Sequence, residues 1–434
     1  MMNSKLEQIS VYLFGNEVGR VAWDGDRQRT FFQYHPDFLA NTKLDKAFPY
    51  IFRNTDSVQV FKDYHNSTFK GLPPPIADSL PDDFGNTIFN NWLKSQNKSL
   101  MDLSPIQQLA YVSNRGMGAL EFKPPANLPE SRTIELNEMV KLVDAVMNNK
   151  KTAQQDGLNE ISLLNIFRIG TSAGGARPKL IVSENRQTGK LVPGDLYSGN
   201  DYSHYLVKLH LDASDKDYNR SKVEFAYYKL ALKAGLEMTP SKLIDDTHFA
   251  TERFDRDENG KVHMLTSTGL TGWDFRKADD SSYENLFRLS YDLGLPQQDL
   301  EALFRRMVFN VMFANTDDHL KNHSFIYKKD ENQWRLSPSY DLTYPLNAMA
   351  KWPNPSRGLS INGKRKNITK EDLLKVAEMF SIKRPQKILN QVEAAGASWN
   401  RIAKNVGVPE PVATSIQDDF KFFNGRQLNQ GLKR

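Results

Sequence analysis

The sequence lacks cysteine entirely, and this absence excludes several kinds of chemistry at once. Disulfide bonds, thiolate zinc sites, iron–sulfur clusters and cysteine nucleophiles all require thiols. No run of about 18 apolar residues occurs, and the N-terminus lacks the apolar segment of a secretion signal. We therefore expect a cytoplasmic protein without a membrane-spanning helix.

A large charge excess is also missing. The 434 residues contain 57 Lys and Arg against 52 Asp and Glu, a net charge of +5 that is too small for a dedicated nucleic-acid binder. Segment 364–387 carries eight basic and three acidic residues, an excess as large as that of the whole chain. A solvated helix face explains this segment best, and the alternative is a contact for DNA or an acidic partner.

The chain contains enough apolar residues, 39%, for two or three folded domains. Prolines at 124, 125 and 129 mark the first boundary. Short strands and loops are predicted before it, a β-rich region follows, and the last part is mainly helical. The predicted class is α+β, with domains at 1–130, 131–266 and 267–434.

Local patterns predict individual elements. A hairpin is expected at 9–22 with Gly15-Asn16 as its turn, an extended stretch at 72–75, and a turn at 81–85. Apolar spacing predicts helices at 133–147 and at 300–312, the second with Asp299 as its cap. A further helix is expected at 222–234, with Gly235 closing it.

The segment Asn315–Ser324 concentrates two carboxylates, two imidazoles, a lysine and two amides directly after an apolar helix. Asp317 and Asn322 have the spacing of the aspartate base and the metal-binding asparagine in a kinase catalytic loop. Phosphoryl transfer needs both, because one group accepts a hydroxyl proton while the other holds Mg²⁺ on the phosphates. The alternative is an ordinary solvated loop.

Asp341 follows nineteen residues after Asn322. The intervening segments 324–327 and 334–336 read as a hairpin, which returns the chain to its start and allows Asp341 to face Asn322 across one metal ion. The alternative is a turn carboxylate that accepts backbone hydrogen bonds.

Two upstream features suit phosphate binding. Residues 170–179 form a glycine-rich turn whose N–H groups suit phosphate oxygens, although an ordinary β-turn has the same composition. Lys208 lies in a predicted strand and shares one face with Leu206 and His210. A kinase presents its phosphate-binding lysine in this way and orients it with a helical Glu, for which Glu224 is the candidate. An exposed edge lysine is the alternative.

Two patterns resemble metal-binding motifs, but each lacks a glutamate that the motif requires. Asp255–Gly260 opens like an EF-hand loop, but Thr266 occupies the position of the bidentate Glu, so a hairpin turn is predicted instead. His319 and His323 have the spacing of helical zinc ligands, but Leu320 replaces the metalloprotease Glu.

Taken together, these motifs resemble the HipA family of bacterial serine/threonine kinase toxins. The resemblance extends from the first hairpin and residues 71–81 through the glycine-rich turn and segment 251–255 to 315–324 and 339–342. It implies a two-lobed, protein-kinase-like fold behind a β-rich N-terminal subdomain, with a mainly helical C-terminal lobe.

The resemblance also implies roles for individual residues. Asp317 would be the catalytic base, and Asn322 and Asp341 would hold Mg²⁺. Ser172 would be autophosphorylated, which would place negative charge among the ATP phosphates and switch the activity off. The residues implied in ATP binding are Gly174, Gly175, Ala176, Arg177, Pro178, Lys179, Lys208, Glu252, Arg253, Phe254 and His319.

The implied activity is ATP- and Mg²⁺-dependent phosphorylation of a translation protein, such as an aminoacyl-tRNA synthetase. The implied partner is a small helix-turn-helix, HipB-like antitoxin, and DNA would be reached only through it. Two alternatives stay open: a catalytically weak co-repressor that binds the antitoxin and operator DNA, and a small-molecule kinase. Intact Asp317, Asn322, Asp341 and Lys208 favour an enzyme.

Overall fold

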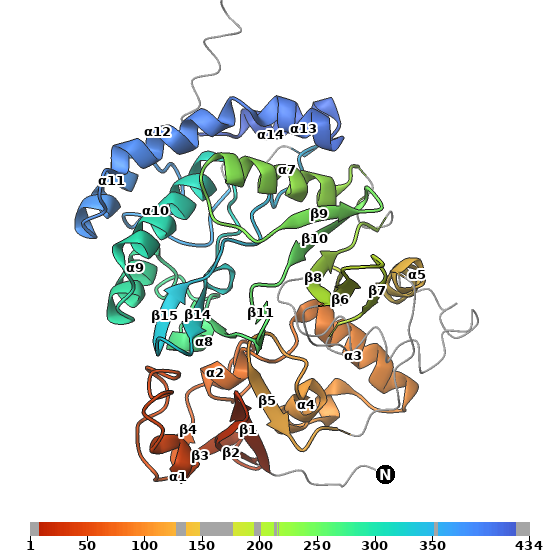
Figure 1. Ribbon diagram of the computed structural model, residues 1–434, viewed down its shortest axis with the longest axis vertical. Helices are drawn as coiled ribbons and strands as arrows, with labels where there is room; N and C mark the ends of the chain where they lie inside the picture. Colours follow the sequence, from red (N-terminus) through yellow and green to blue (C-terminus); the bar gives the residue numbers. More distant parts are fainter. Residues whose placement is uncertain are drawn as a thin grey trace, which may run out of the picture. The chain divides into compact units, whose positions relative to one another are not determined.

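A computed structural model describes residues 8–126, 136–147, 177–194, 201–211, 215, 217–350 and 355–421 (Figure 1). The chain divides into two compact units, which are described separately below. Unit 1 comprises Met1–Ala213, Ala250–Gly272 and Ile326–Gln333, and unit 2 comprises Ser214–Phe249, Trp273–Phe325 and Trp334–Arg434. Helices and several small sheets occur together, which confirms the predicted α+β class.

Unit 1 begins with a five-stranded antiparallel sheet in the order β4-β3-β2-β1-β5. The predicted hairpin is present, but its turn lies one residue earlier than expected, at Phe14 and Gly15. Both residues have positive φ, as a two-residue hairpin turn requires, and Asn16 begins the second strand. The strands are β1 (Gln8–Leu13), β2 (Asn16–Asp24), β3 (Arg29–Tyr34), β4 (Gln59–Phe61) and β5 (Leu120–Lys123).

Helices between β3 and β5 were not predicted from the sequence. Instead of a turn at 81–85, Asp82 caps a 13-residue helix by accepting a hydrogen bond from the N–H of Gly85. Its apolar residues, from Phe84 to Leu93, recur at helical spacing and are buried. Likewise, the expected extended stretch at 72–75 gives way to a helical turn. The helices are α1 (Pro36–Leu39), α2 (Pro74–Ala77), α3 (Asp83–Ser95), η1 (Leu100–Asp102) and α4 (Pro105–Val112).

The later part of unit 1 contains strand β6, which pairs antiparallel with both β7 and β8. A two-stranded hairpin, β11–β12, forms at 256–261, as the sequence predicted in place of an EF-hand loop. The elements are α5 (Leu136–Met147), β6 (Lys179–Asn185), β7 (Leu191–Pro193), β8 (Tyr202–Lys208), β11 (Arg256–Asp257), β12 (Gly260–Lys261), β13 (His263–Thr266) and α8 (Ser267–Thr271). Strand β10 (His248–Glu252) has residues in both units.

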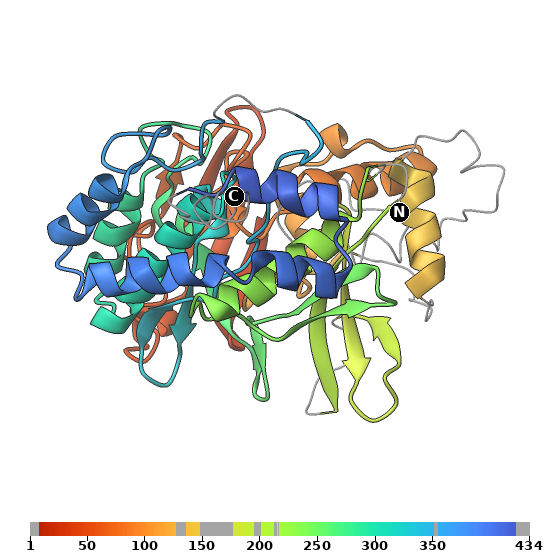
Figure 2. The ribbon, with the colours of Figure 1, turned by 90° about the horizontal axis from the view of Figure 1, so that it is seen from above.

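Unit 2 is mainly helical and has one extensive hydrophobic core. Helix α13 packs against α7, and α12 packs against α10, an arrangement that is visible in Figure 2. Burying each large apolar side chain of this core contributes about 1.5–3 kcal/mol. The elements are α7 (Arg220–Lys233), β9 (Ser241–Ile244), α9 (Tyr283–Asp292), α10 (Gln297–Met312), η3 (Leu320–Asn322), α11 (Lys370–Met379), α12 (Pro385–Gly396), α13 (Trp399–Val406) and α14 (Glu410–Asp418).

Helices α7 and α10 confirm two predictions, and Gly235 ends α7 with positive φ. Asp299, however, does not cap α10. The helix begins two residues earlier, at Gln297, and the Asp299 carboxylate instead accepts hydrogen bonds from Arg335 at 2.8 and 2.9 Å. Arg335 lies on β15 (Gln333–Leu336), which forms the predicted hairpin with β14 (Ser324–Lys328).

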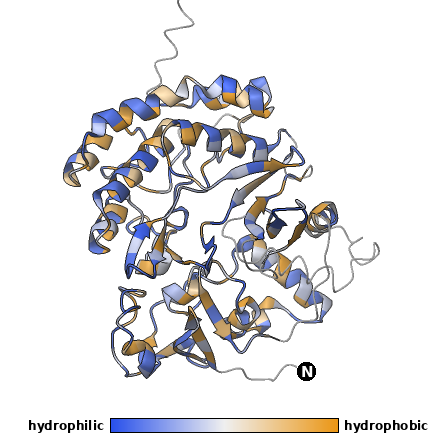
Figure 3. Cartoon of the chain, in the orientation of Figure 1, coloured by the Kyte–Doolittle hydropathy of each residue, from blue (hydrophilic) through white to orange (hydrophobic). Residues whose placement is uncertain are grey.

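Figure 3 shows that the helices of unit 2 carry both hydrophobic and hydrophilic residues, as amphipathic helices over a core do. Within the described part of the chain, no helix is both long enough and apolar enough to span a bilayer.

Candidate active site

A buried polar network sets the start of the loop that follows α10. The side chain of Asn315 donates to Asn310 at 3.0 Å, and Asn310 donates to the Tyr283 hydroxyl at 2.9 Å. That hydroxyl donates to Asp318 at 2.9 Å. All four side chains are at most 2% exposed, so the network joins the loop to α10 and α9 inside the core of unit 2.

Asp318 is the structural anchor of this loop. It is 1% exposed and accepts two hydrogen bonds from the guanidinium of Arg357, at 2.6 and 3.2 Å. The backbone N–H groups of Gly358 and Leu359 donate to its other oxygen. Gly358 is required at its position because a Cβ atom there would lie 2.8 Å from the backbone nitrogen of His319.

Asp317, the adjacent residue, has the opposite environment. Its side chain is 63% exposed, and one carboxylate oxygen lies 3.8 Å from Nε2 of His319. The His319 ring lies 5.2 Å from the ring of Phe275, which also contacts the Arg276 guanidinium at 4.3 Å. Asp317 therefore presents its carboxylate at the surface beside a partly buried imidazole.

Asn322 ends the short helix η3. Its side-chain nitrogen donates to the backbone carbonyl of Asp317 at 2.7 Å, which fixes the Asp-x4-Asn spacing in space. Among the described residues, its amide oxygen Oδ1 accepts no hydrogen bond. The oxygen that a hard cation prefers is thus left for other partners.

Tyr340 links the Asp341 segment to this loop. Its hydroxyl donates to the backbone carbonyl of Lys321 at 2.8 Å and lies 2.5 Å from the Ser324 hydroxyl. Because Tyr340 and Lys321 are the immediate neighbours of Asp341 and Asn322, these contacts bring the two predicted metal ligands to one part of unit 2. Asp341 itself has φ +55°, a left-handed conformation that is uncommon outside glycine.

Arg306, from α10, holds the segment before Asp341. It is 2% exposed and donates to the Ser339 hydroxyl at 2.9 Å and to the Ser337 carbonyl at 2.6 Å. Burial lowers the pKa of this guanidinium to about 10, which leaves it charged at neutral pH. A strained Asp341 is thus supported by a rigid anchor.

The oxygen donors Asn322 and Asp341 fit Mg²⁺, which takes one or two protein oxygens and fills its remaining positions with water and substrate phosphates. A dedicated protein cage is not needed. The described residues contain no cluster of three or more His, Asp or Glu side chains that could hold a metal ion.

In unit 1, Lys208 and Lys179 lie opposite each other on the paired strands β8 and β6. Lys208 is 6% exposed, so it is a buried lysine and not an exposed edge residue. Lys179 is 1% exposed, and its ammonium lies 3.2 Å from Asp82, the cap of α3. The Lys179 charge is therefore bound to the N-terminal part of unit 1. Glu224, the predicted partner of Lys208, is buried on α7 of unit 2.

The predicted adenine segment alternates between two environments. Arg253 is 4% exposed and forms two hydrogen bonds with the fully buried carboxylate of Asp255, at 2.8 and 2.7 Å. Burial alone raises the pKa of Asp255, but Arg253 and Arg256 outweigh it and lower the pKa. Glu252 and Phe254 are only partly buried. The arginine thus stabilises the segment, and its neighbours remain candidates for ligand contacts.

Part of the predicted phosphate loop lies outside the described residues, namely Ser172, Gly174, Gly175 and Ala176. Arg177 and Pro178 are described and directly precede β6. The carbonyl of Pro178 accepts a hydrogen bond from the N–H of Leu209, beside Lys208. The end of the loop is therefore fixed to the strand that carries Lys208.

Sequence reasoning missed Tyr340, Arg357 and Tyr283, the residues that hold the loop in place. Tyr340 could have been found, because it directly precedes Asp341 in a segment that was already singled out. Arg357 and Tyr283 are 39 and 35 residues from Asp318, and no local pattern connects them to it.

Two family models match the chain. The HipA N-terminal domain matches residues 9–123, and the HipA-like C-terminal domain matches residues 171–400, more than half of the sequence. The chain belongs to the HipA family. The predicted resemblance is thereby confirmed.

Two curated relatives come from Sinorhizobium fredii (strain NBRC 101917 / NGR234). "Putative kinase Y4dM" is 28% identical over 255 residues, covering 54% of this chain and 60% of the relative. "Putative kinase Y4mE" is 24% identical over 301 residues, covering 63% of this chain and 65% of the relative. The chain thus spans less than two thirds of the length of each.

Among solved structures, the HipA-family chain is similar to one from the Shewanella oneidensis MR-1 toxin–antitoxin system, a complex of HipA, HipB and operator DNA. The similarity covers 97% of both chains with a TM-score of 0.62 and 16% identity. At this identity the likeness shows the fold, which is that of HipA.

Proposed function

We propose that this chain is an ATP- and Mg²⁺-dependent protein kinase of the HipA type that phosphorylates serine or threonine. The observation that carries the proposal is the pair of adjacent aspartates. Asp318 is buried and saturated with hydrogen bonds, whereas Asp317 is exposed and is tied through its backbone carbonyl to Asn322. A catalytic base needs this combination of a rigid frame and an accessible carboxylate.

In the proposed reaction, the oxygen of a serine or threonine hydroxyl forms a bond to the γ-phosphorus of ATP as the bond to the β–γ bridging oxygen breaks. ADP leaves with that bond's electrons, and the hydroxyl proton passes to the Asp317 carboxylate. Asn322 and Asp341 would hold Mg²⁺, which would offset charge on the phosphates. Lys208 binds phosphate oxygens, while Glu252 and Phe254 contact adenine.

Two finer proposals follow from the family resemblance. The protein substrate is a translation component, such as an aminoacyl-tRNA synthetase. Ser172 is an autophosphorylation site, and its phosphate places negative charge in the loop that cradles ATP, which ends activity by repulsion. Residues 174–178 together with His319 complete the proposed nucleotide contacts, whereas Lys179 is assigned to its ion pair with Asp82.

A HipB-like helix-turn-helix antitoxin is the proposed partner, and this chain reaches operator DNA through it. Support comes from the Shewanella complex, which contains HipA, HipB and operator DNA. The rival functions are a catalytically weak co-repressor and a small-molecule kinase. The accessible Asp317 favours an enzyme over the co-repressor, and substrate screening separates the two kinds of kinase.

The test is transfer of label from radiolabelled ATP by the wild type and by Asp317→Asn. We expect Asp317→Asn to lose about 10²–10⁴-fold in rate, the usual contribution of a general base, and to keep its melting temperature. Phosphoproteomics after brief induction of both proteins identifies the substrate, and mass spectrometry after ATP incubation tests Ser172. Undiminished labelling by Asp317→Asn contradicts the assignment, and phosphate found only elsewhere contradicts the switch.

A further inference from the structure

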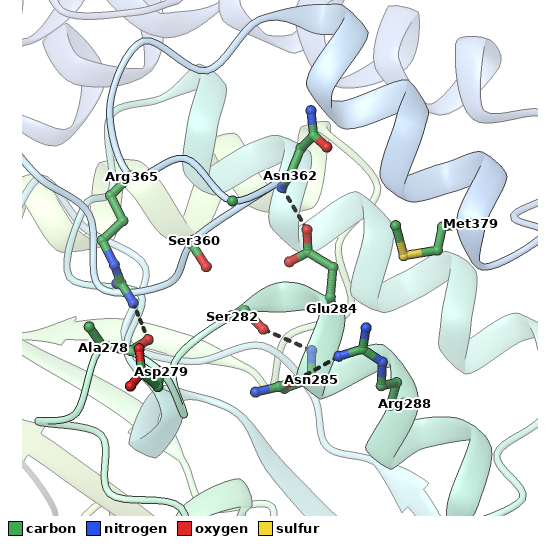
Figure 4. Close-up of a pocket in the computed structure, with 11 residues that line it drawn as sticks. Ala278, Asp279, Ser282, Glu284, Asn285, Arg288, Ser360, Asn362, Arg365 and Met379 are labelled. Carbon is green, nitrogen blue, oxygen red and sulfur yellow. Dashed lines mark hydrogen bonds between the residues drawn. The ribbon is translucent and has the colours of Figure 1, made fainter.

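Unit 2 contains a pocket that is separate from the residues assigned to phosphoryl transfer. It lies between the start of α9, the segment 360–365 and the end of α11 (Figure 4). Its volume is about 570 Å³, which is enough for a small molecule or a long side chain. None of the predicted catalytic, nucleotide or metal residues lines it.

One lining residue, Glu284, is incompletely satisfied. It is 8% exposed, and its Oε1 accepts a hydrogen bond from the backbone N–H of Asn362 at 2.6 Å. Its other oxygen, Oε2, is buried and has no hydrogen-bond partner among the described residues. A buried carboxylate oxygen without a donor is costly, so a hydrogen-bond donor placed at this oxygen would stabilise the protein.

The cations of the pocket do not supply that donor. Arg365 directs Nη2 at the carbonyls of Ala278 and Ser281, both at 2.7 Å, and Nη1 at those of Arg357 and Gly358. Arg288 is exposed and donates through Nη1 to Asn285. Because Arg365 already uses both terminal nitrogens, an anion would find few free donors there and would meet the charge of Glu284.

The other walls suit an alkyl ammonium. Figure 4 shows the Ser360 hydroxyl and the Glu284 carboxylate bordering the same open space, so two oxygen acceptors are available to one donor group. Met379, which is 56% exposed, gives an apolar and flexible surface at one side. A chain of methylene groups can lie along Met379 while its charged end approaches Glu284.

We propose that this pocket binds a primary ammonium group carried on an alkyl chain. A lysine side chain of a protein partner and a free alkyl amine share this chemistry. The ammonium donates to Oε2 of Glu284 and to the Ser360 hydroxyl, and its alkyl stem packs on Met379. Binding is independent of the kinase chemistry, because Glu284 is not part of the proposed reaction.

Isothermal titration calorimetry of the full chain with cadaverine tests the proposal. We expect one saturable site, weakened at least tenfold in Glu284→Gln. The glutamine can still accept from Asn362, so the local backbone is retained. Asp292→Asn, an exposed change at the end of the same helix, is the control and should bind like the wild type. Equal binding by Glu284→Gln, or no binding by the wild type, overturns the proposal.

A second variant leaves Glu284 in place. Met379→Lys supplies an ammonium from the wall of the pocket, so it should raise the melting temperature and abolish cadaverine binding, whereas Met379→Leu should retain it. Unchanged cadaverine binding in Met379→Lys contradicts the proposal, even if Glu284→Gln fails to fold.

Two further titrations identify the source of the ligand and the sign of its charge. An acetylated and amidated Gly-Lys-Gly peptide that binds at least as tightly as cadaverine supports a protein lysine, and binding by cadaverine alone supports a free amine. Inorganic phosphate should not bind. A phosphate site that Glu284→Gln strengthens would overturn the ammonium assignment.

Discussion

The loop 315–322 of unit 2 and the strand pair β6–β8 of unit 1 each contain two like charges close together. The two charged side chains differ in exposure in the loop but not in the strand pair. Asp318 is 1% exposed, whereas the side chain of Asp317 is 63% exposed. Lys179 and Lys208 are both buried, at 1% and 6% exposure. Burial therefore separates the carboxylates into an anchor and a reactive group, whereas both lysines are buried, and the ion pair of Lys179 with Asp82 assigns Lys179 a structural role.

The largest expected effect comes from removing the partner of the anchor. Arg357→Met leaves the buried Asp318 carboxylate without its cation, which should destabilise the protein by about 3–5 kcal/mol. The control is Arg335→Met, which breaks a more exposed pair with Asp299 and should cost less. Urea unfolding measures both. Equal losses would show that Asp318 is no more an anchor than Asp299.

The next largest effects should distinguish the two lysines by their roles in stability and in ATP binding. Lys179→Met leaves Asp82 without its ammonium and should destabilise the protein by about 3 kcal/mol, while ATP still raises its melting temperature. In Lys208→Met we expect the ATP-induced rise to disappear. Thermal melts with and without ATP and Mg²⁺ measure both. The reverse pattern would exchange the roles assigned to the two lysines.

The stability of the protein should depend on pH in the acid range because of His263 of unit 1. Burial lowers its pKa from 6.5 to about 3. Between these values the unfolded chain binds a proton that the folded chain does not, so stability falls as pH falls through this window. One such group contributes a slope of about 1.4 kcal/mol per pH unit. Urea unfolding across this range measures how the free energy of unfolding changes with pH. In His263→Phe this slope should be smaller by the contribution of one proton, and the exposed His65→Phe is the control. An unchanged slope contradicts the prediction.

The smallest effect is expected in the basic segment 364–387. Lys364 pairs with Asp372, Lys370 pairs with Glu393 and Arg365 donates to backbone carbonyls, whereas the five other basic residues are exposed. Charge reversal at Lys366, Lys375 and Lys387 should change stability by no more than about 0.5 kcal/mol. DNA affinity of an assembled antitoxin complex tests the alternative, and a loss there would show that the segment is more than a solvated face.

The sequence was sufficient where the information is local. Apolar spacing located α10, the closing Gly235 located the end of α7, and the turn signals located the hairpin before Asp341. Helix α3 was missed because Pro81, Asp82 and Asp83 at its start resemble a turn, although Asp82 is in fact its cap. The sequence around Asp317 and Asp318 could not show which of the two is accessible. Asp318 is held in the core by Arg357 and Tyr283, which are far away in the sequence.

The central claim is that Asp317 reacts while Asp318 supports it, and a side-by-side measurement tests it most directly. Asp317→Asn and Asp318→Asn are compared for label transfer from ATP and for melting temperature. The account predicts that Asp317→Asn melts like the wild type and transfers label about 10²–10⁴-fold more slowly, whereas Asp318→Asn melts lower and retains transfer at a temperature where it is folded. Transfer at the wild-type rate by folded Asp317→Asn, or a loss of transfer confined to folded Asp318→Asn, would contradict the account.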